Sequence, residues 1–179
     1  MKRAAFPLLV AVAGCSAPQA VPQQVAPPPA TVAEPAPLPA GPVDSILVDK
    51  SDRTLTLFSR GVPLKSYVGV QLGDEPEGPK HFEGDERTPE GHYTVDYRNP
   101  RSAYHLSLHI SYPDAADRAY AAARGYRPGG EIFIHGQPNA LVEGRMQGDW
   151  TDGCISVSNG EIEELWRLVA DGTPIEILP

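Results

Sequence analysis

The sequence predicts a mainly β domain with two short helices, and this prediction rests on three observations. Several short runs alternate apolar and polar residues, which is the period of a half-buried strand. Only two stretches place apolar residues at helical spacing. The chain also holds 20 Pro and 17 Gly among 179 residues, more than one compact domain usually contains, so part of it lies outside the fold.

Six runs with alternating side chains are predicted as strands. They cover residues 45–50, 54–58, 64–72, 92–97, 105–110 and 174–178. The first two form a hairpin, with Ile46 and Val48 on one face of the first strand and Leu55 and Leu57 on one face of the second. In the fifth run, His105, Ser107 and His109 share one face and the aliphatic residues between them share the other. Residues 73–87 are rich in Gly, Pro and charge and form a long loop, a type of segment that often carries function.

Two helices are predicted, over residues 113–124 and 160–170. The first is rich in Ala and ends before Gly125. The second begins with a capping box, because Ser158 is followed three residues later by Glu161. Its apolar residues recur at helical spacing and form one face: Ile162, Leu165, Trp166 and Val169.

Residues 1–14 have the layout of a secretory signal peptide. Two basic residues precede an apolar run over residues 4–13 that is too short to span a bilayer. The sequence Val-Ala-Gly-Cys ending at Cys15 resembles the bacterial lipobox, which implies cleavage before Cys15 and its lipidation. In a Gram-negative bacterium, Ser16 then favours the outer membrane, on its periplasmic face. An ordinary signal peptide with an incidental cysteine is the alternative.

A lipidated cysteine and a Pro-rich linker over residues 15–42 precede one domain at residues 43–179. The linker is built mainly of Pro, Ala, Val and Gln, so it forms no packed core and extends as a semi-rigid spacer of at most about 75 Å. The remaining residues suffice for one domain and are too few for two. This layout is typical of an enzyme held at a membrane, and in the periplasm its target could be the cell wall.

Composition and charge exclude several classes of protein. A net charge of −8 and a pI near 5.0 provide no basic surface for phosphate backbones, so a nucleic-acid partner is not expected. Two cysteines exclude a multi-disulfide framework and a Cys/His zinc finger. No helical His-Glu-x-x-His spacing is present, and neither a metal nor another cofactor is expected.

Two short motifs carry the candidate chemistry. Residues 131–136 end a buried strand on His135, followed by Gly136, which lets other backbone approach closely. Cys154 follows 19 positions after the histidine. A cysteine nucleophile needs a base that takes the thiol proton and returns it to the leaving amine, and one imidazole can do both. A buried, inert cysteine is the alternative from composition alone.

These motifs resemble the bacterial L,D-transpeptidase catalytic-domain family. The resemblance rests on Ile-His-Gly at residues 134–136, Thr-Asp-Gly-Cys-Ile at 151–155 and the ending Trp-Arg-Leu-Val-Ala-Asp-Gly-Thr-Pro-Ile-Glu-Ile at 166–177. Residues 45–73 are similar to the family's opening meander, and Arg-Thr-Pro-Glu-Gly-His-Tyr at 87–93 is similar to its TPxG turn. The match spans nearly the whole domain. It implies the family's β-sandwich catalytic domain, of the α+β class.

The resemblance also implies a mechanism and a substrate class. Cys154 would attack the carbonyl after meso-diaminopimelate in a peptidoglycan stem peptide and release D-Ala, with His135 as base and then acid. An amine acceptor from a stem peptide, a D-amino acid or an envelope lipoprotein would resolve the thioester. The Gly136 carbonyl would orient the imidazole, so no acidic third residue is needed. Backbone amides around Gly153 and Cys154 are expected to form the oxyanion hole.

The motif departs at two positions from the commoner family pattern, in which Ser-x-Gly-Cys is followed by an Arg two residues after the cysteine. Thr151 retains a hydroxyl, whereas Ser156 stands at the Arg position and cannot replace a guanidinium. The form Trp-Thr-x-Gly-Cys-Ile resembles a branch whose members could cut, rather than make, links between peptidoglycan and an attached protein. Three basic residues are candidates for the missing charge, with a solvated surface position as the alternative: Arg87, Arg145 and Lys80.

Four residues are predicted to contact substrate: Thr151, Trp150, His105 and Arg87. His105 could equally be structural, and Trp150 could form core or groove wall. Three functions remain open: a transpeptidase, a cysteine hydrolase of the same fold, and a non-catalytic module that binds wall peptides. Retention of both His135 and Cys154 argues against the third.

Overall fold

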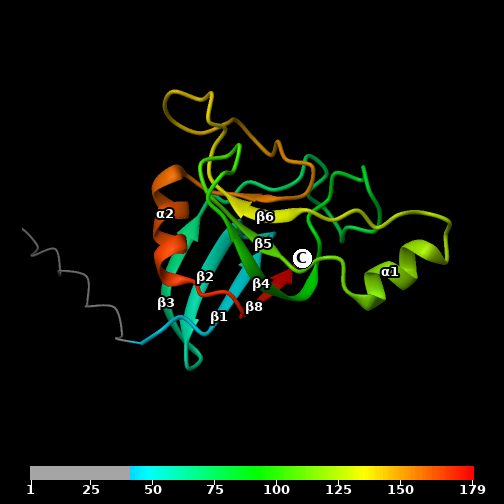
Figure 1. The fold of residues 1–179 in the computed structure, drawn as a ribbon, viewed down its shortest axis with the longest axis horizontal. Coiled ribbons are helices and arrows are strands. Elements are labelled where there is room, and N and C mark those ends of the chain that lie inside the picture. The colour runs from blue at the N-terminus through cyan, green and yellow to red at the C-terminus, as the bar shows by residue number, and fades with distance from the viewer. Residues whose placement is uncertain (1–40) are drawn as a thin grey trace, which may run out of the picture. The chain divides into compact units, whose positions relative to one another are not determined.

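Eight strands and two helices make up the part of the chain that the computed structural model describes, residues 41–179 (Figure 1). The strands are β1 (Ser45–Asp49), β2 (Thr54–Ser59), β3 (Val62–Val68), β4 (Gly91–Asn99), β5 (Ser107–Ile110), β6 (Ile132–His135), β7 (Ile155–Ser156) and β8 (Thr173–Leu178). The helices are α1 (Ala115–Ala122) and α2 (Asn159–Leu168). The predicted class, mainly β with two short helices, is confirmed.

The predicted signal segment, the lipidation of Cys15 and most of the linker fall on residues 1–40, outside the described part of the chain. They therefore stay predictions. The described residues all belong to one unit, Pro37–Pro179. Neither of the two helices in this unit is long and apolar enough to cross a membrane.

All eight strands belong to one sheet, in the order β3-β2-β1-β8-β4-β5-β6-β7. The first three form the predicted antiparallel meander. The last strand of the chain, β8, inserts between β1 and β4, parallel to β1 and antiparallel to β4. The beginning and the end of the domain are therefore joined by one hydrogen-bonded ladder in the middle of the sheet.

The two edges of the sheet meet at Gln71 and Ser156. The strand predicted over residues 64–72 runs instead over Val62–Val68, because Gly69 has a φ of +70° and breaks the extended conformation. Beyond this break, Gln71 and Ser156 exchange two backbone hydrogen bonds, with N···O distances of 2.9 and 2.7 Å. The sheet therefore curls into a half-barrel, and the two layers of the expected sandwich are two halves of one sheet (Figure 1).

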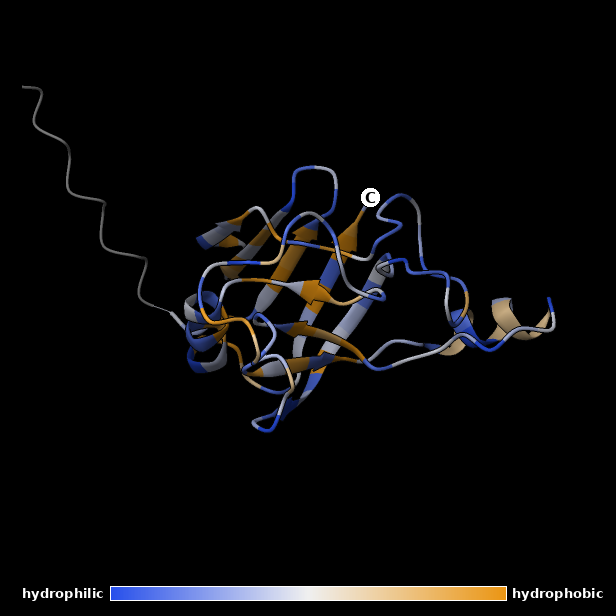
Figure 2. Ribbon diagram, turned by 90° about the horizontal axis from the view of Figure 1, so that it is seen from above, coloured by the Kyte–Doolittle hydropathy of each residue, from blue (hydrophilic) through white to orange (hydrophobic). Residues whose placement is uncertain are grey.

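One hydrophobic core fills the domain, and alternate residues of the strands form it. The residues that alternation placed inside the meander are 2% exposed or less: Ile46, Val48, Leu55 and Leu57. Burying each such side chain contributes about 1.5–3 kcal/mol. Helix α2 covers the core with Ile162 and Leu165 and packs against β5 and β6. Its predicted capping box is confirmed, since Ser158 and Glu161 each accept the other's backbone amide. Figure 2 shows the apolar residues on the strands and the polar residues on the loops.

Helix α1 lies away from the sheet in both views (Figures 1 and 2). It begins later than predicted, at Ala115, because Asp114 is its N-cap and accepts the amides of the second and third helical residues. Of its residues, only Ala121 is buried. Two aromatic stacks tie this part of the chain to the long loop over residues 73–87: His81 on Tyr120 and Phe82 on Tyr126.

Candidate active site

His135 is the last residue of β6, and the next residue of the chain fixes its ring. Its Nδ1 lies 2.7 Å from the Gly136 carbonyl oxygen, and since that oxygen can only accept, the proton sits on Nδ1. Nε2 then carries a lone pair and can accept a proton. His135 is 2% exposed, and burial lowers its pKa below the ordinary value, so the imidazole is neutral at neutral pH.

Two aromatic side chains cover the imidazole. Tyr104 stacks on His135 with 4.5 Å between ring centroids. Trp150 meets the same ring edge-on at 5.5 Å. These contacts hold the ring in place, and they explain why it is buried although it lines a cavity.

Cys154 is presented by a tight turn that depends on a glycine. Thr151 Oγ1 donates to the Cys154 carbonyl at 2.7 Å and accepts the Gly153 amide at 3.2 Å. Gly153 has a φ of +126°, and a Cβ at this position would lie 2.4 Å from the carbonyl oxygen of Arg87. Only glycine fits there without a shift of the backbone. The Thr-x-Gly-Cys motif is therefore a structural unit that places the thiol.

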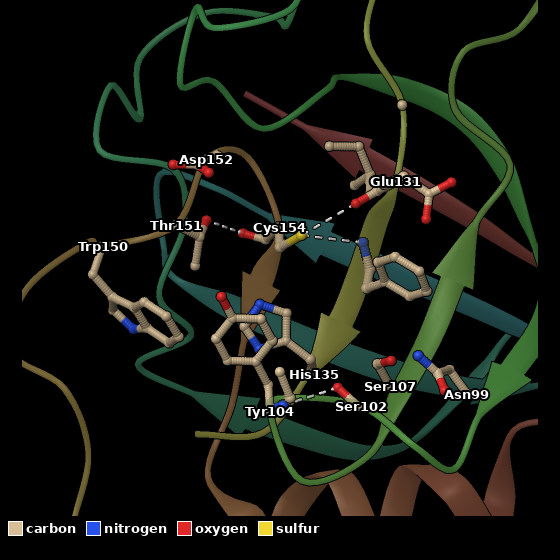
Figure 3. Close-up of a pocket in the computed structure, with 14 residues that line it drawn as sticks. Asn99, Ser102, Tyr104, Ser107, Glu131, His135, Trp150, Thr151, Asp152 and Cys154 are labelled. Atoms are coloured by element: carbon tan, nitrogen blue, oxygen red, sulfur yellow. Dashed lines mark hydrogen bonds between the residues drawn. The ribbon is translucent and has the colours of Figure 1, made fainter. Parts of the chain in front are cut away.

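The Cys154 thiol rests against backbone groups at the start of β6 (Figure 3). Its sulfur accepts the Phe133 amide at 3.4 Å and donates to the Glu131 carbonyl at 3.5 Å. Burial raises the pKa of the thiol to about 11. The hydrogen bond from the Phe133 amide lowers this pKa, and the carboxylates of Asp152 and Glu131 raise it further. The unliganded thiol is therefore protonated at neutral pH, and its hydrogen points to a backbone carbonyl rather than to His135.

Cys154 and His135 line the same cavity, which has a volume of about 480 Å³. Trp150 and Thr151, two of the predicted substrate contacts, also line it. Three further polar residues line it that the motifs did not reveal: Asn99, Ser102 and Ser107. Ser107 pairs with His135 in the β5–β6 ladder. The alternation of residues 105–110 could have revealed Ser107, because this residue lies on the strand face away from the aliphatic residues. A thiol beside a proton acceptor in one cavity is suited to acyl transfer through a thioester.

Comparison with known proteins assigns the family. The model of the L,D-transpeptidase catalytic domain, YkuD, matches residues 44–177. The chain belongs to the L,D-transpeptidase catalytic-domain family. It is 33% identical over 134 residues to YafK of Escherichia coli K12, a candidate L,D-transpeptidase, with 69% of this chain and 46% of YafK covered. The chain thus spans about half the length of the curated relatives it matches.

Two solved structures resemble the L,D-transpeptidase domain of this chain. Pgp2 of Campylobacter jejuni, described as a helical cell shape determining protein, matches with a TM-score of 0.61 at 28% identity, over 75% of this chain and 47% of Pgp2. Bd1075 of Bdellovibrio bacteriovorus matches with a TM-score of 0.53 at 29% identity, again over 75% of this chain and 47% of the other.

Two of the predicted substrate contacts lie outside the cavity of this L,D-transpeptidase domain. His105 has a φ of +67°, so it lies before β5 begins, and its ring binds Glu163 of α2 at 2.8 Å. The alternation predicted over residues 105–110 does not include His105, because this residue is not extended. Arg87 contributes its backbone, since its carbonyl packs against Gly153 while its guanidinium lies beside Gly78.

Of the three basic side chains considered for the missing charge, Lys80 is the one whose charge acts on the Cys154 thiol. It lines a second cavity of about 650 Å³, which shares Gly130, Glu131 and Asp152 with the first. Its ammonium already pairs with Asp85 at 2.8 Å. Arg145 instead donates to a carbonyl beyond β3. Within residues 41–179, no three His, Cys, Asp or Glu side chains are grouped as a metal site.

Proposed function

We propose that this chain is a cysteine L,D-transpeptidase that acts on peptidoglycan stem peptides through a thioester. One observation carries the proposal: a single cavity holds the Cys154 thiol and the His135 imidazole, whose Nδ1 is fixed on the Gly136 carbonyl. Only Nε2 is then free to take a proton. Family membership supports the substrate class, and the described role of Pgp2 in cell shape is in keeping with it.

In the first half-reaction, the Cys154 sulfur attacks the carbonyl carbon that follows meso-diaminopimelate. His135 Nε2 takes the thiol proton as the C–S bond forms, and it returns this proton to the nitrogen of the departing D-Ala when the C–N bond breaks. The products are a thioester on Cys154 and a free amino acid. Because both side chains start neutral, the site holds no buried ion pair before the substrate arrives.

A backbone amide is the donor that we assign to the negative oxygen of the tetrahedral intermediate. The Gly153 amide, expected from the sequence, already donates to Thr151 Oγ1. The Cys154 amide has no backbone acceptor among residues 41–179 and belongs to the residue that carries the sulfur. We therefore assign the oxyanion contact to Cys154 itself, with Gly153 shaping the turn.

In the second half-reaction, an acceptor amine replaces D-Ala. His135 Nε2 removes a proton from the amine as it attacks the thioester, and it returns a proton to the Cys154 sulfur when the C–S bond breaks. The acceptor would be an amine of a neighbouring stem peptide, a D-amino acid, or a lysine of an envelope lipoprotein. The product carries a new amide bond at the diaminopimelate carbonyl, and the thiol is regenerated.

The proposal places this reaction in the periplasm, with the domain anchored at the outer membrane by a lipid on Cys15. It is supported by the signal layout of residues 1–14 and by the Pro-rich linker that ends at residue 42. Fractionation of cells that express the full chain or its Cys15→Ala variant tests the anchor. Loss of the variant from the membrane fraction supports lipidation, and an equal distribution of the two contradicts it.

A cysteine hydrolase of the same fold is the second candidate function, and Ser156 is the observation that favours it. The commoner motif has an Arg there, which could pair with the carboxylate of a departing D-Ala, and a serine cannot. A link from peptidoglycan to a lysine side chain has no carboxylate next to the leaving nitrogen. In this case water would take the place of the acceptor amine, with Cys154 and His135 in the same roles.

Product analysis with the full chain and its Cys154→Ala variant tests these functions. Each is incubated with disaccharide tetrapeptide and a labelled D-amino acid, and the products are identified by mass. Exchange of the terminal D-Ala that depends on Cys154 supports the transpeptidase. Loss of D-Ala without incorporation, or reaction only with protein-linked peptidoglycan, supports the hydrolase. If none of these substrates reacts in a Cys154-dependent way, both candidates are wrong.

A further inference from the structure

Two buried residues outside the catalytic cavity reach the histidine through a backbone carbonyl. Gln137 is 1% exposed, and Ser156 is fully buried. Neither lines the cavities on the two sides of Cys154. Gln137 lies two positions after His135 in the chain, and Ser156 lies two positions after Cys154. Gln137 therefore follows the end of β6, and Ser156 ends β7, which begins directly after Cys154.

Hydrogen bonds connect these two residues to the imidazole in a continuous chain. The Ser156 hydroxyl donates to the Gly136 carbonyl at 3.4 Å, and the same oxygen accepts His135 Nδ1 at 2.7 Å. The Gln137 side-chain amide donates to Ser156 Oγ at 2.9 Å and to the Val157 carbonyl at 2.8 Å. Because Ser156 Oγ accepts from Gln137, its own hydrogen is free to point at Gly136.

Gln71 binds the other side of this hydrogen-bond network and connects it to the wall of the cavity. Its Oε1 lies 3.2 Å from Gln137 Nε2 and shares one of the two amide hydrogens with another acceptor, and its own Nε2 donates to the carbonyls of Met146 and Gly148 at 2.7 and 2.5 Å. Gln137 Oε1 accepts the Met146 amide at 2.8 Å. The segment held in this way leads directly to Trp150, which covers the imidazole.

We propose that Gln137 and Ser156 are positioning residues that fix the orientation and tautomer of His135 through the Gly136 carbonyl. A side-chain amide has its donors and its acceptor at fixed places, so the chain of hydrogen bonds defines where the carbonyl oxygen points. If that oxygen turned away, Nδ1 would lose its acceptor and the proton would be free to move to Nε2. Nε2 is the atom that must accept the thiol proton, so the wrong tautomer is inactive. The kinetic part of this inference rests on the proposed function.

The first test reads the tautomer of His135 directly, by ¹⁵N NMR of the histidine side chains in the full chain. His135→Gln identifies the signal. Ser156→Ala removes one hydroxyl, and Gln137→Met removes the amide at similar volume. We expect the Nδ1–H tautomer in the unsubstituted chain and a mixture with Nε2–H in both variants. An unchanged tautomer in folded Ser156→Ala overturns the proposal, and this variant decides because it perturbs the fold least.

The second test compares turnover across pH. General acid–base catalysis contributes about 100- to 10,000-fold, so we expect kcat to fall by at least about 10-fold in Ser156→Ala and Gln137→Met, with KM little changed. The acidic limb of the kcat/KM profile should shift as well. Ser156→Thr keeps the hydroxyl and should restore most of the rate. A wild-type kcat and pH profile in both variants contradicts the positioning role.

Thr173→Val is the matched control. It removes a buried hydroxyl that donates to the Ala170 carbonyl at 2.7 Å, at the start of β8 and three strands from β6 in the sheet. We expect a lower melting temperature with the wild-type tautomer and pH profile. If this variant changes the tautomer of His135 as much as Ser156→Ala does, the effect is a general loss of rigidity and the proposal is wrong.

The two readouts also separate this inference from the proposed function. If the unsubstituted chain shows no Cys154-dependent turnover but Ser156→Ala and Gln137→Met still shift the tautomer of His135, the proposed function is wrong and the positioning role stands. Turnover in the unsubstituted chain, with variants that keep both kcat and tautomer, overturns the positioning role alone.

Discussion

Strands β1, β2, β3, β4 and β8 are five to nine residues long, whereas β5, β6 and β7 at the other end of the sheet have four, four and two residues. We call these the long half and the short half. The strands of the long half bury mainly aliphatic and aromatic side chains, while those of the short half also bury Ser107, His109, His135 and Ser156. Because β7 has only two residues and pairs with Ile134 and His135, it does not reach the Phe133 amide of β6, which binds the Cys154 sulfur instead.

The comparison shows how one sheet can serve stability and chemistry at once. The long half is held by hydrogen-bonded ladders and by the burial of apolar side chains. The short half is held by side chains that hydrogen-bond backbone groups, as in the network around Gln71 and Gln137. Substitutions in the long half should therefore change the free energy of unfolding, and substitutions in the short half should change turnover.

Replacing the base should give the largest effect. In His135→Gln, no side chain takes the thiol proton, so we expect kcat to fall by about 100- to 10,000-fold. The free energy of unfolding should change less than it does for a core truncation in the long half. Turnover with disaccharide tetrapeptide and urea titration of the same sample measure both quantities. A kcat that stays within about tenfold of the unsubstituted chain would show that His135 is not the base.

Reactivity of the thiol should rise steeply with pH. The pKa of Cys154 is raised to about 11, so the reactive thiolate is a small fraction at neutral pH and grows about tenfold per pH unit up to that value. Alkylation by iodoacetamide in a Cys15→Ala background, which leaves only Cys154, measures this fraction. Between pH 7 and 10 we expect about a 1,000-fold increase in rate without a plateau. A rate that levels off below pH 8 would instead show a stable thiolate in the short half.

The long half could be predicted from sequence because its patterns are local and repeat. Alternation over β1 and β2 placed Ile46, Val48, Leu55 and Leu57 in the core, where the structure has them. In the short half, the two residues of β7 are too few to show any period, and no strand was predicted there. The position of β8 between β1 and β4 depends on pairing between distant parts of the chain, which local pattern does not encode.

The candidate site divides in the same way. Cys154, His135 and Gly136 could be predicted because they stand in short motifs. Gln71 and Gln137 could not, because 66 positions separate them and a glutamine that will be buried looks like any other in the sequence. His105 was predicted to contact substrate, with a structural role as the alternative, and its positive φ takes it out of the strand. Motifs thus reveal the reacting groups, while their supports depend on the folded sheet.

Truncation of a core residue in the long half should separate stability from turnover. Leu57 in β2 is fully buried, so Leu57→Ala should lower the free energy of unfolding by about 2–5 kcal/mol. Val62→Ala, at a residue of β3 that is 49% exposed, should change it by less than about 0.5 kcal/mol. In both variants, kcat per folded molecule should equal that of the unsubstituted chain, since neither residue lines the catalytic cavity. A lower kcat in folded Leu57→Ala would mean that the two halves are coupled through the core.

The smallest expected difference is between two glycines, one in a turn of each half. Gly61 and Gly153 have φ values of +75° and +126°, and a left-handed backbone costs an Ala about 1–2 kcal/mol. A Cβ on Gly61 meets nothing within 4 Å, whereas on Gly153 it would lie 2.4 Å from the Arg87 carbonyl oxygen. Gly61→Ala should therefore lower only the free energy of unfolding. Gly153→Ala should lower it further and also reduce kcat, because the backbone that has to move carries Cys154. If the two variants have the same free energy of unfolding and the same kcat, the turn before Cys154 can change its backbone without moving the sulfur. In that case this turn does not fix the position of the thiol.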